Sequence, residues 1–346
     1  MGTIQTDITR LLGIQTPIVL APMAGVSGGA LASEVALAGG FGFLAPVYTG
    51  VEKFRDEFAI VRSTLGLPSG PLPIGAGFLG WKLEEAGGRH IPLLELALEN
   101  GVRAIWLSFG EDLGRWIELV RNHDQKTGKS PKTLVFLQVN SVDEALFAVQ
   151  AWKVDVLVAQ GIESGGHGSA SAPPVLNLVP EVLSALPPSG APPVLAAGGL
   201  SSGGHLAAFL TLGAAGAVVG TRFLVAEESQ YPEVHKRAII AAKTGSTVRS
   251  YVFDQLRDTT GWPAGVDGRG LAIPALAAVE RGSDIAQIKE EVAEGTKRGD
   301  PSSVIAWAGT GVGPLSRLQP AKDIVRELHE AAVAHLKASS VLVGNV

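Results

Sequence analysis

The sequence contains no cysteine among its 346 residues. This absence excludes disulfides, thiolate nucleophiles and cysteine-ligated metals. It leaves the compartment open, because a secreted enzyme can also lack disulfides.

Charge is scarce in this chain. Charged residues make up 18% of it, against 46% hydrophobic residues, and the formal net charge is −5. With a pI near 5.8 and no basic run, a nucleic-acid partner is not expected. The same balance, with a mean hydropathy of +0.27, is typical of a densely packed folded protein.

A long hydrophobic run is also missing. The first ten residues are polar and lack the apolar centre of a signal peptide. The longest apolar tract, residues 206–219, is interrupted by Thr211, Gly213 and Gly216 and is too short to cross a membrane. We therefore expect a cytoplasmic enzyme with no membrane partner.

What the chain does contain is a regular series of short apolar runs, most of them followed by a segment with helical spacing. The runs are nearly all apolar and do not alternate, as expected for parallel strands covered on two faces. Their number and rhythm favour a (β/α)₈ barrel, with a doubly wound open sheet as the alternative. The predicted strands are residues 17–23, 41–46, 72–78, 104–109, 133–139, 154–160, 193–198 and 217–223.

After residue 223 the pattern changes to helical stretches separated by glycine-rich loops. We expect residues 1–224 to form the barrel and residues 225–320 to form a smaller helical lobe. Residues 321–346 hold an amphipathic helix that is expected to pack back on the barrel.

His167 is the strongest candidate for catalysis. It lies in a glycine-rich stretch, residues 160–168, directly after an apolar strand, where barrel enzymes place their chemistry. Its imidazole suits proton abstraction, whereas the alternative is a core histidine that bonds a backbone carbonyl. His90, His123, His235 and His329 are expected at solvated helix positions, and no histidine and carboxylate spacing indicates a metal.

A second signal is a set of glycines after the last two strands. Gly198, Gly199, Gly220 and Thr221 lack bulk where backbone N–H groups can approach a phosphate, and Ser202 is a suitable N-cap for the next helix. The alternative is tight turns that need glycine for their own conformation. Two such sites at the expected strand ends favour phosphate binding.

Three further residues are candidates at the strand ends. Met23 offers a soft apolar surface for a flat ring, although methionine is also ordinary core filler. Gln138 and Gln160 close two apolar strands, where each amide either bonds a ligand or satisfies loop backbone. Aromatic residues that either wall a substrate pocket or fill the core are Phe78, Trp81, Trp106, Phe109 and Tyr251.

Four motifs together resemble the nitronate monooxygenases, formerly called 2-nitropropane dioxygenases. They are APMAG at residues 21–25, QGIESGGHG at 160–168, AGGL at 197–200 and GTRF at 220–223. The order and spacing of four motifs make the resemblance specific, and it covers about residues 10–245. The segment GFLGW at residues 77–81 is most similar to the fungal branch.

The resemblance implies a TIM barrel that holds non-covalent FMN, with the lobe of residues 225–320 over the active site. It implies oxidation of alkyl nitronates, and of nitroalkanes, by O₂ to carbonyl compounds and nitrite. The partners are then small molecules, and the protein is a monomer or a homodimer.

The same resemblance implies roles for single residues. His167 matches the catalytic base, Met23 lies beside the flavin ring, and Gly77 and Gln138 stand where many relatives carry asparagine and lysine. The predicted FMN-binding residues are Met23, Gly77, Gln138, Gln160, Gly165, Gly198, Gly199, Gly220 and Thr221.

Other reactions remain open at this point. An FMN-dependent NAD(P)H oxidoreductase acting on quinones or enoyl thioesters is the nearest alternative, since barrel enzymes of that kind need no dinucleotide fingerprint. A non-redox lyase or isomerase that binds the phosphate of its own substrate is a second alternative. A purely structural role is disfavoured, because glycine-rich loop ends destabilise a fold that has no ligand for them.

Overall fold

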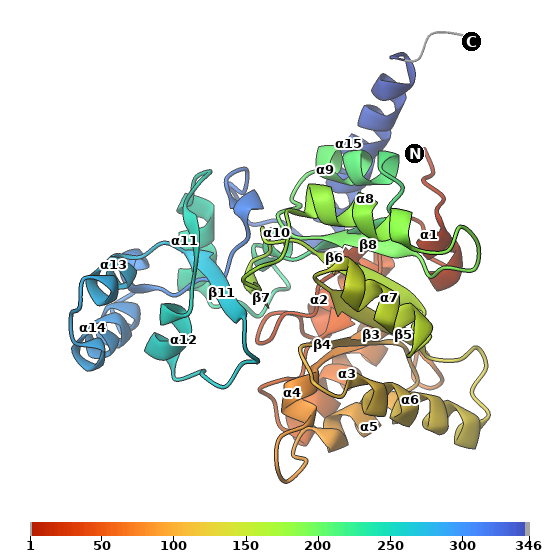
Figure 1. The fold of residues 1–346 in the computed structure, drawn as a ribbon, viewed down its shortest axis with the longest axis horizontal. Coiled ribbons are helices and arrows are strands. Elements are labelled where there is room, and N and C mark those ends of the chain that lie inside the picture. Colours follow the sequence, from red (N-terminus) through yellow and green to blue (C-terminus); the bar gives the residue numbers. More distant parts are fainter. Residues whose placement is uncertain (1, 343–346) are drawn as a thin grey trace.

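The computed structural model describes residues 2–342 and contains an eight-stranded parallel sheet (Figure 1). The sheet order is β1-β9-β8-β6-β5-β4-β3-β2, and each predicted strand is present. The strands are β1 (Ile18–Leu20), β2 (Phe43–Leu44), β3 (Leu72–Leu79), β4 (Val102–Ser108), β5 (Leu134–Val139), β6 (Val156–Gln160), β8 (Val194–Ala197) and β9 (Gly216–Val219).

The sheet closes on itself next to β2. Val19 in β1 forms a parallel bridge with Phe41, and the Leu20 N–H donates to the Phe41 carbonyl at 2.9 Å. Eight parallel strands with helices between them therefore form a (β/α)₈ barrel, as predicted. The last strand is shorter than expected, because the chain leaves it at Val219 and enters a helical turn at Thr221.

The predicted helices between the strands are all present. Five further helices were not predicted, and the longest of them, Val51–Leu65, does have helical spacing through Phe54, Phe58 and Val61. The helices of this part are α1 (Asp7–Leu12), α2 (Gly29–Leu37), α3 (Val51–Leu65), α4 (Gly80–Leu83), α5 (Ile91–Glu99), α6 (Leu113–Thr127), α7 (Val142–Gln150), α8 (Val175–Ala185), α9 (Gly203–Thr211) and α10 (Thr221–Leu224).

The inside of the barrel is filled with aromatic rings. Phe43 contacts Trp106 and Phe136 edge to face, with ring centroids 5.4 and 5.2 Å apart. At the amino ends of the strands, α1 places the fully buried Ile8 against the same cluster. The barrel is therefore solid at that end, and any ligand site must lie at the carboxyl ends of the strands.

Residues 225–320 lie to one side of the barrel, at the left in Figure 1. They have an apolar core of their own around Phe253 and Leu256. A small antiparallel sheet that the sequence did not predict, order β10-β11-β7, connects these residues to β7 (Gly166–Ser169), which follows β6 in the barrel segment. The elements are α11 (Glu233–Ala241), β10 (Thr247–Ser250), α12 (Val252–Arg257), β11 (Val266–Leu271), α13 (Pro274–Glu280), α14 (Ile285–Lys297), η1 (Pro301–Ser303) and η2 (Thr310–Val312).

The final helix, α15 (Ala321–Ser340), packs on α9 and α2 of the barrel. Its apolar face is buried there through Ile324, Val325 and Leu328. Of the predicted segment 321–346, residues 343–346 lie outside the described residues. Within the described part of the chain, no helix combines the length and the apolar character needed to span a membrane.

Candidate active site

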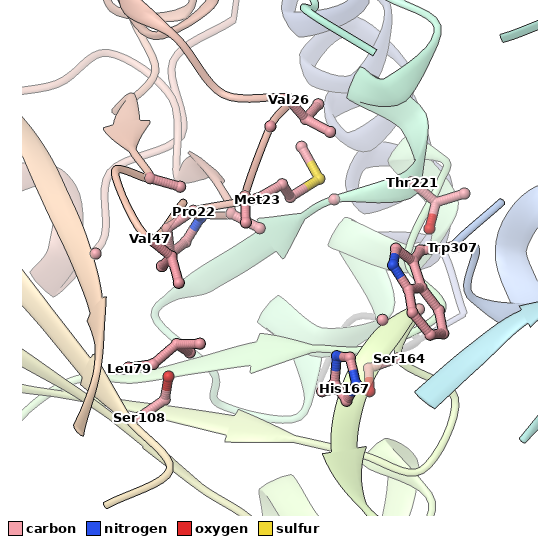
Figure 2. Close-up of a pocket in the computed structure, with 18 of the residues that line it drawn as sticks. Pro22, Met23, Val26, Val47, Leu79, Ser108, Ser164, His167, Thr221 and Trp307 are labelled. Atoms are coloured by element: carbon pink, nitrogen blue, oxygen red, sulfur yellow. The ribbon is translucent and has the colours of Figure 1, made fainter. Parts of the chain in front are cut away.

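A cavity of about 490 Å³ lies at the carboxyl ends of the barrel strands (Figure 2). Its size is in the range of small-molecule and cofactor sites. Every residue proposed from the sequence as catalytic or cofactor-binding lines it. They are Met23, Gly77, Gln138, Gln160, Gly165, His167, Gly198, Gly199, Gly220 and Thr221.

On the side of β8, the cavity is bounded by closely packed backbone. Gly198 and Gly199 have φ values of 115° and 72°, which side chains disfavour. A Cβ on Gly165 would lie 2.3 Å from the Gly309 nitrogen. The glycines at these positions are therefore required by the fold itself, and their presence alone does not indicate a ligand.

Gly220 differs from its neighbours. A Cβ there would meet nothing nearer than the Met23 sulfur at 3.5 Å and the Ala21 Cβ at 3.6 Å, which are ordinary contacts. Its φ of −108° is also accessible to other residues. The protein does not need glycine here, so the missing side chain leaves space for a ligand at the cavity wall.

The loop that follows Trp307 supports this region from outside. The Gly309 N–H donates to the Thr221 hydroxyl at 2.9 Å, and the Thr310 N–H donates to the Glu163 carbonyl at 3.0 Å. Residues distant in sequence thus hold the β6, β9 and C-terminal loops in one position. Within residues 2–342 the Thr221 hydroxyl has no acceptor for its own proton, which it can therefore donate to a ligand in the cavity.

The two glutamines at the ends of β5 and β6 form one hydrogen-bonded unit. Gln138 Nε2 donates to Gln160 Oε1 at 2.9 Å, and Asn140 Nδ2 donates to the Gln160 carbonyl at 2.8 Å. Gln160 Nε2 donates to no group within the described residues and therefore remains available to a ligand. Asn140 was not identified from the sequence, although it follows the same strand.

The opposite wall is largely apolar. Figure 2 shows Met23 next to Pro22 and Val47, with Leu79 and Ser108 below them and with His167 and Trp307 on the other side of the space. The Met23 N–H donates to the Ser27 hydroxyl at 2.6 Å, which fixes the loop after β1. Of the five aromatic candidates, three line the cavity, whereas Trp81 packs on Trp262 with ring centroids 5.2 Å apart and Tyr251 is 42% exposed.

His167 lies on a strand, β7 (Gly166–Ser169), and not in a loop as its glycine neighbours suggested. It pairs in register with Gly268 of β11, so the second sheet holds its backbone. Gly268 has no room for a side chain, because a Cβ would lie 2.4 Å from the Trp307 ring. Gly268 and the glycines next to His167 therefore allow β7 and β11 to pack closely over the barrel.

The imidazole of His167 is held by partners that no sequence motif indicated. Its Nε2 lies 2.9 and 3.0 Å from the two carboxylate oxygens of Asp254, which is fully buried on α12. The ring of Trp262 stacks on it, with centroids 3.6 Å apart and planes at 10°. Thr259 in turn donates to Asp254 Oδ1 at 2.8 Å.

Other ionisable side chains line the cavity. His235 does so, and burial, with the nearby charge of Arg257, lowers its pKa to about 4. Tyr231 is buried, which raises its pKa, and its hydroxyl accepts the Trp307 N–H at 2.9 Å. The prediction of a solvated His235 was therefore wrong.

Another histidine prediction also fails. His329 is 8% exposed and contacts the Thr16 hydroxyl and the Gly2 carbonyl at 2.9 and 2.7 Å. It fastens α15 to the amino-terminal segment and takes no part in the cavity. Across residues 2–342, no group of three histidine or acidic side chains is placed to hold a metal ion.

Comparison with known proteins identifies the family of this chain. The family model described as nitronate monooxygenase matches residues 94–331. This chain belongs to the nitronate monooxygenase family. The enzyme is thus an oxidoreductase of that family.

Its relatives align over nearly the whole chain. Nitronate monooxygenase npaC of Metarhizium robertsii is 36% identical over 93% of this chain and 92% of its own. The nitronate monooxygenase of Neurospora crassa is 35% identical, over 92% and 90%. The nitronate monooxygenase of the bacterium Pseudomonas aeruginosa is 31% identical, over 93% and 97%. The two fungal relatives are thus more similar to this chain than the bacterial one, which confirms the expected likeness to fungal members.

Solved structures agree on the fold. The nitroalkane oxidase of Streptomyces ansochromogenes superimposes with a TM-score of 0.76 at 28% identity, over 96% of this chain and 100% of that one. FabK from Thermotoga maritima gives a TM-score of 0.79 at 24% identity, over 99% and 100%. The likeness to FabK concerns the fold alone.

Proposed function

We propose that this enzyme is an FMN-dependent nitronate monooxygenase that oxidises alkyl nitronates, and nitroalkanes, with O₂ to carbonyl compounds and nitrite. The observation that carries the proposal is that one cavity brings His167 together with the space beside Gly220 and the amides of β5 and β6. Membership of the nitronate monooxygenase family supports the same reaction class.

The residues around the cavity fit FMN. Backbone at Gly198, Gly199 and Gly220, with the Thr221 hydroxyl, suits a phosphate, because these positions offer N–H groups without obstructing side chains. Gln138 Oε1 and Gln160 Nε2, which the bond between the two amides leaves over, suit a ring edge or a ribityl hydroxyl. FMN, when bound, supplies redox chemistry that no side chain of this enzyme provides.

The protein's own contribution to the reaction is proton transfer and binding. His167 removes the acidic α-proton of a neutral nitroalkane, and the electron pair of that C–H bond moves into the nitro group to give the nitronate. The protonated imidazole then stands next to an anion and stabilises it. Apolar side chains such as Met23 and Phe78 limit water around these charges.

The test combines the visible spectrum of the purified protein with an assay for nitrite. Purified enzyme should be yellow and should release nitrite from ethyl nitronate and from nitroethane in air, without NADH. A colourless protein, or one that forms no nitrite from either substrate, would refute the proposal. Rapid anaerobic bleaching of the flavin by NADH, without nitrite release, would favour an NAD(P)H oxidoreductase instead.

The cytoplasmic location and the monomeric or dimeric state expected from the sequence stay predictions. The division at residues 224 and 320 is likewise our proposal, supported by the separate apolar core around Phe253.

A further inference from the structure

We propose that Asp254 is a positioning residue for His167: it fixes the tautomer of the imidazole so that Nδ1 is the basic atom, and it stabilises the imidazolium after proton transfer. This inference rests on the proposed function of His167 as a base. It adds to the site a residue that lies 87 positions from His167 in the sequence.

The first step is the identity of the donor. An ionised carboxylate only accepts hydrogen bonds, so Nε2, between 2.9 and 3.0 Å from the two Asp254 oxygens, must carry a proton. In the neutral ring the lone pair then resides on Nδ1. Nδ1 has no hydrogen-bond partner within residues 2–342 and is not enclosed by them, so it stays accessible from the cavity.

The second step is the fixed position of the carboxylate. Asp254 is flanked on α12 by Phe253 and Leu256, which are buried in the apolar core of residues 225–320. The helix ends at Arg257, and the left-handed φ of 55° at Asp258 turns the chain back so that Thr259 reaches Oδ1. Helix packing and the Thr259 bond together leave the carboxylate little freedom to move.

The third step is electrostatic. Asp254 is 0% exposed, and a buried carboxylate without a partner is costly. Within the described residues, its side-chain hydrogen-bond partners are His167 and Thr259. Its negative charge is compensated best when the ring is protonated, and that is the state His167 reaches on accepting a proton.

The other charges near His167 do not replace Asp254. Arg249 of β10 bonds Asp267, and Arg269 of β11 bonds the Ile162 carbonyl at 3.2 Å. Arg257 and His235 line the same cavity, as do the phenols Tyr48 and Tyr231. Arg257 opposes a second positive charge, so the favourable contribution to the imidazolium comes from Asp254.

The stacked Trp262 completes the arrangement. Its ring lies parallel to the imidazole at 3.6 Å and prevents it from rotating away from Asp254. An indole face also favours a cation over a neutral ring. The imidazole therefore has one nitrogen bound to Asp254 and presents the other to substrate.

The experiment compares Asp254→Asn with Asp258→Asn. Asparagine at 254 keeps the size and one acceptor oxygen but removes the charge. Asp258 is a matched control directly after the same helix, since its side chain is 78% exposed and pairs with Lys289, and asparagine also adopts its left-handed φ. Flavin content and thermal unfolding verify that each variant is folded and loaded.

With Asp254→Asn we expect kcat/KM for nitroethane to fall about 100-fold, because a positioned base contributes about 10²–10⁴-fold, while ethyl nitronate changes less than about threefold. The deuterium isotope effect on [1,1-²H₂]nitroethane should rise, since proton abstraction becomes slower. Equal losses on the two substrates, or none, would overturn the proposal.

A second readout does not depend on turnover. Histidine labelled with ¹⁵N allows the tautomer of the His167 ring, assigned by its loss in His167→Asn, to be read by NMR from the chemical shifts of Nδ1 and Nε2. In wild type Nε2 should carry the proton of the neutral ring, because the Asp254 carboxylate accepts from it, whereas in Asp254→Asn the Nδ1–H tautomer should become populated, because the asparagine amide can donate to Nε2. The same tautomer in the two proteins would refute the role of Asp254, whereas a wild-type enzyme without nitrite formation would refute only the proposed function.

Discussion

At the scale of single residues, the neighbours of a side chain decide what it can do. His167 and His235 line the same cavity, yet burial and the charge of Arg257 lower the pKa of His235, whereas a carboxylate bonds His167. Within residues 2–342, no carboxylate lies next to His235 to stabilise a proton on its ring. Two identical side chains in one site are thereby suited to different roles.

Replacing His167 by asparagine should separate the two substrates of the proposed reaction. Turnover of neutral nitroethane should fall about 10²–10⁴-fold, because no base remains to remove the α-proton. Ethyl nitronate, already ionised, should lose much less. Nitrite release on both substrates is the measurement, with the flavin spectrum as the control, and equal loss with flavin retained would contradict the role of base.

The glycines around the cavity allow ligand binding to be separated from folding. Gly220→Ala adds a methyl group that the protein accommodates, so the unfolding free energy of the apoprotein should stay within about 0.5 kcal/mol. Its affinity for FMN should fall about tenfold, or about 1.4 kcal/mol.

Gly198→Ala is the comparison for that variant. Its φ of 115° and its close backbone contacts predict a loss of stability of about 1–3 kcal/mol before any cofactor is added. Urea unfolding of the apoproteins and FMN titration measure the two quantities. If Gly220→Ala binds FMN as tightly as wild type, the phosphate does not approach this position.

At the scale of secondary-structure elements, the repeated β/α units of the barrel could be predicted well from the sequence. Apolar runs without alternation identify parallel strands, because both faces of such strands are buried. His167 and Gly268, which pair where β7 meets β11, lie in glycine-rich segments with no such pattern. The sheet β10-β11-β7 could not be predicted from the sequence for that reason.

Helix α15 offers a prediction at this scale. Leu328 is 5% exposed where the helix packs on the barrel, so Leu328→Ala should lower the unfolding free energy by about 2–5 kcal/mol. Leu342, beyond the helix, is 83% exposed, and its alanine variant should change stability by less than about 0.5 kcal/mol. Similar urea curves for the two variants would show that α15 is not part of the cooperative fold.

At the scale of the whole molecule, the site is assembled from both ends of the chain. Residues that line the cavity from the barrel were predictable, because barrel enzymes bind ligands where the strands end. Asp254, Trp262 and Trp307 come from residues 225–320 and reach His167 only through the packing of that segment. No local spacing encodes such contacts, since they depend on how two cores are placed against each other.

The stability of the whole fold should depend on pH through His235. Its pKa is 6.5 in an unfolded chain and about 4 in the folded protein, mainly because it is buried. Its Nδ1 has no hydrogen-bond partner within residues 2–342. Between pH 6.5 and 4 the unfolded state therefore binds a proton that the folded state does not, and stability falls as the pH is lowered through this range.

His235→Gln removes that titration. The decrease in unfolding free energy between pH 7 and pH 4 should therefore be smaller in the variant than in wild type, by at most about 3 kcal/mol. Above pH 7 the two proteins should show the same pH dependence, because His235 is then neutral in both states. The exposed His335 on α15 supplies the control, since His335→Gln should leave the curve unchanged. Urea unfolding at a series of pH values measures all three proteins, and parallel curves for wild type and His235→Gln would show that His235 titrates normally in the folded enzyme.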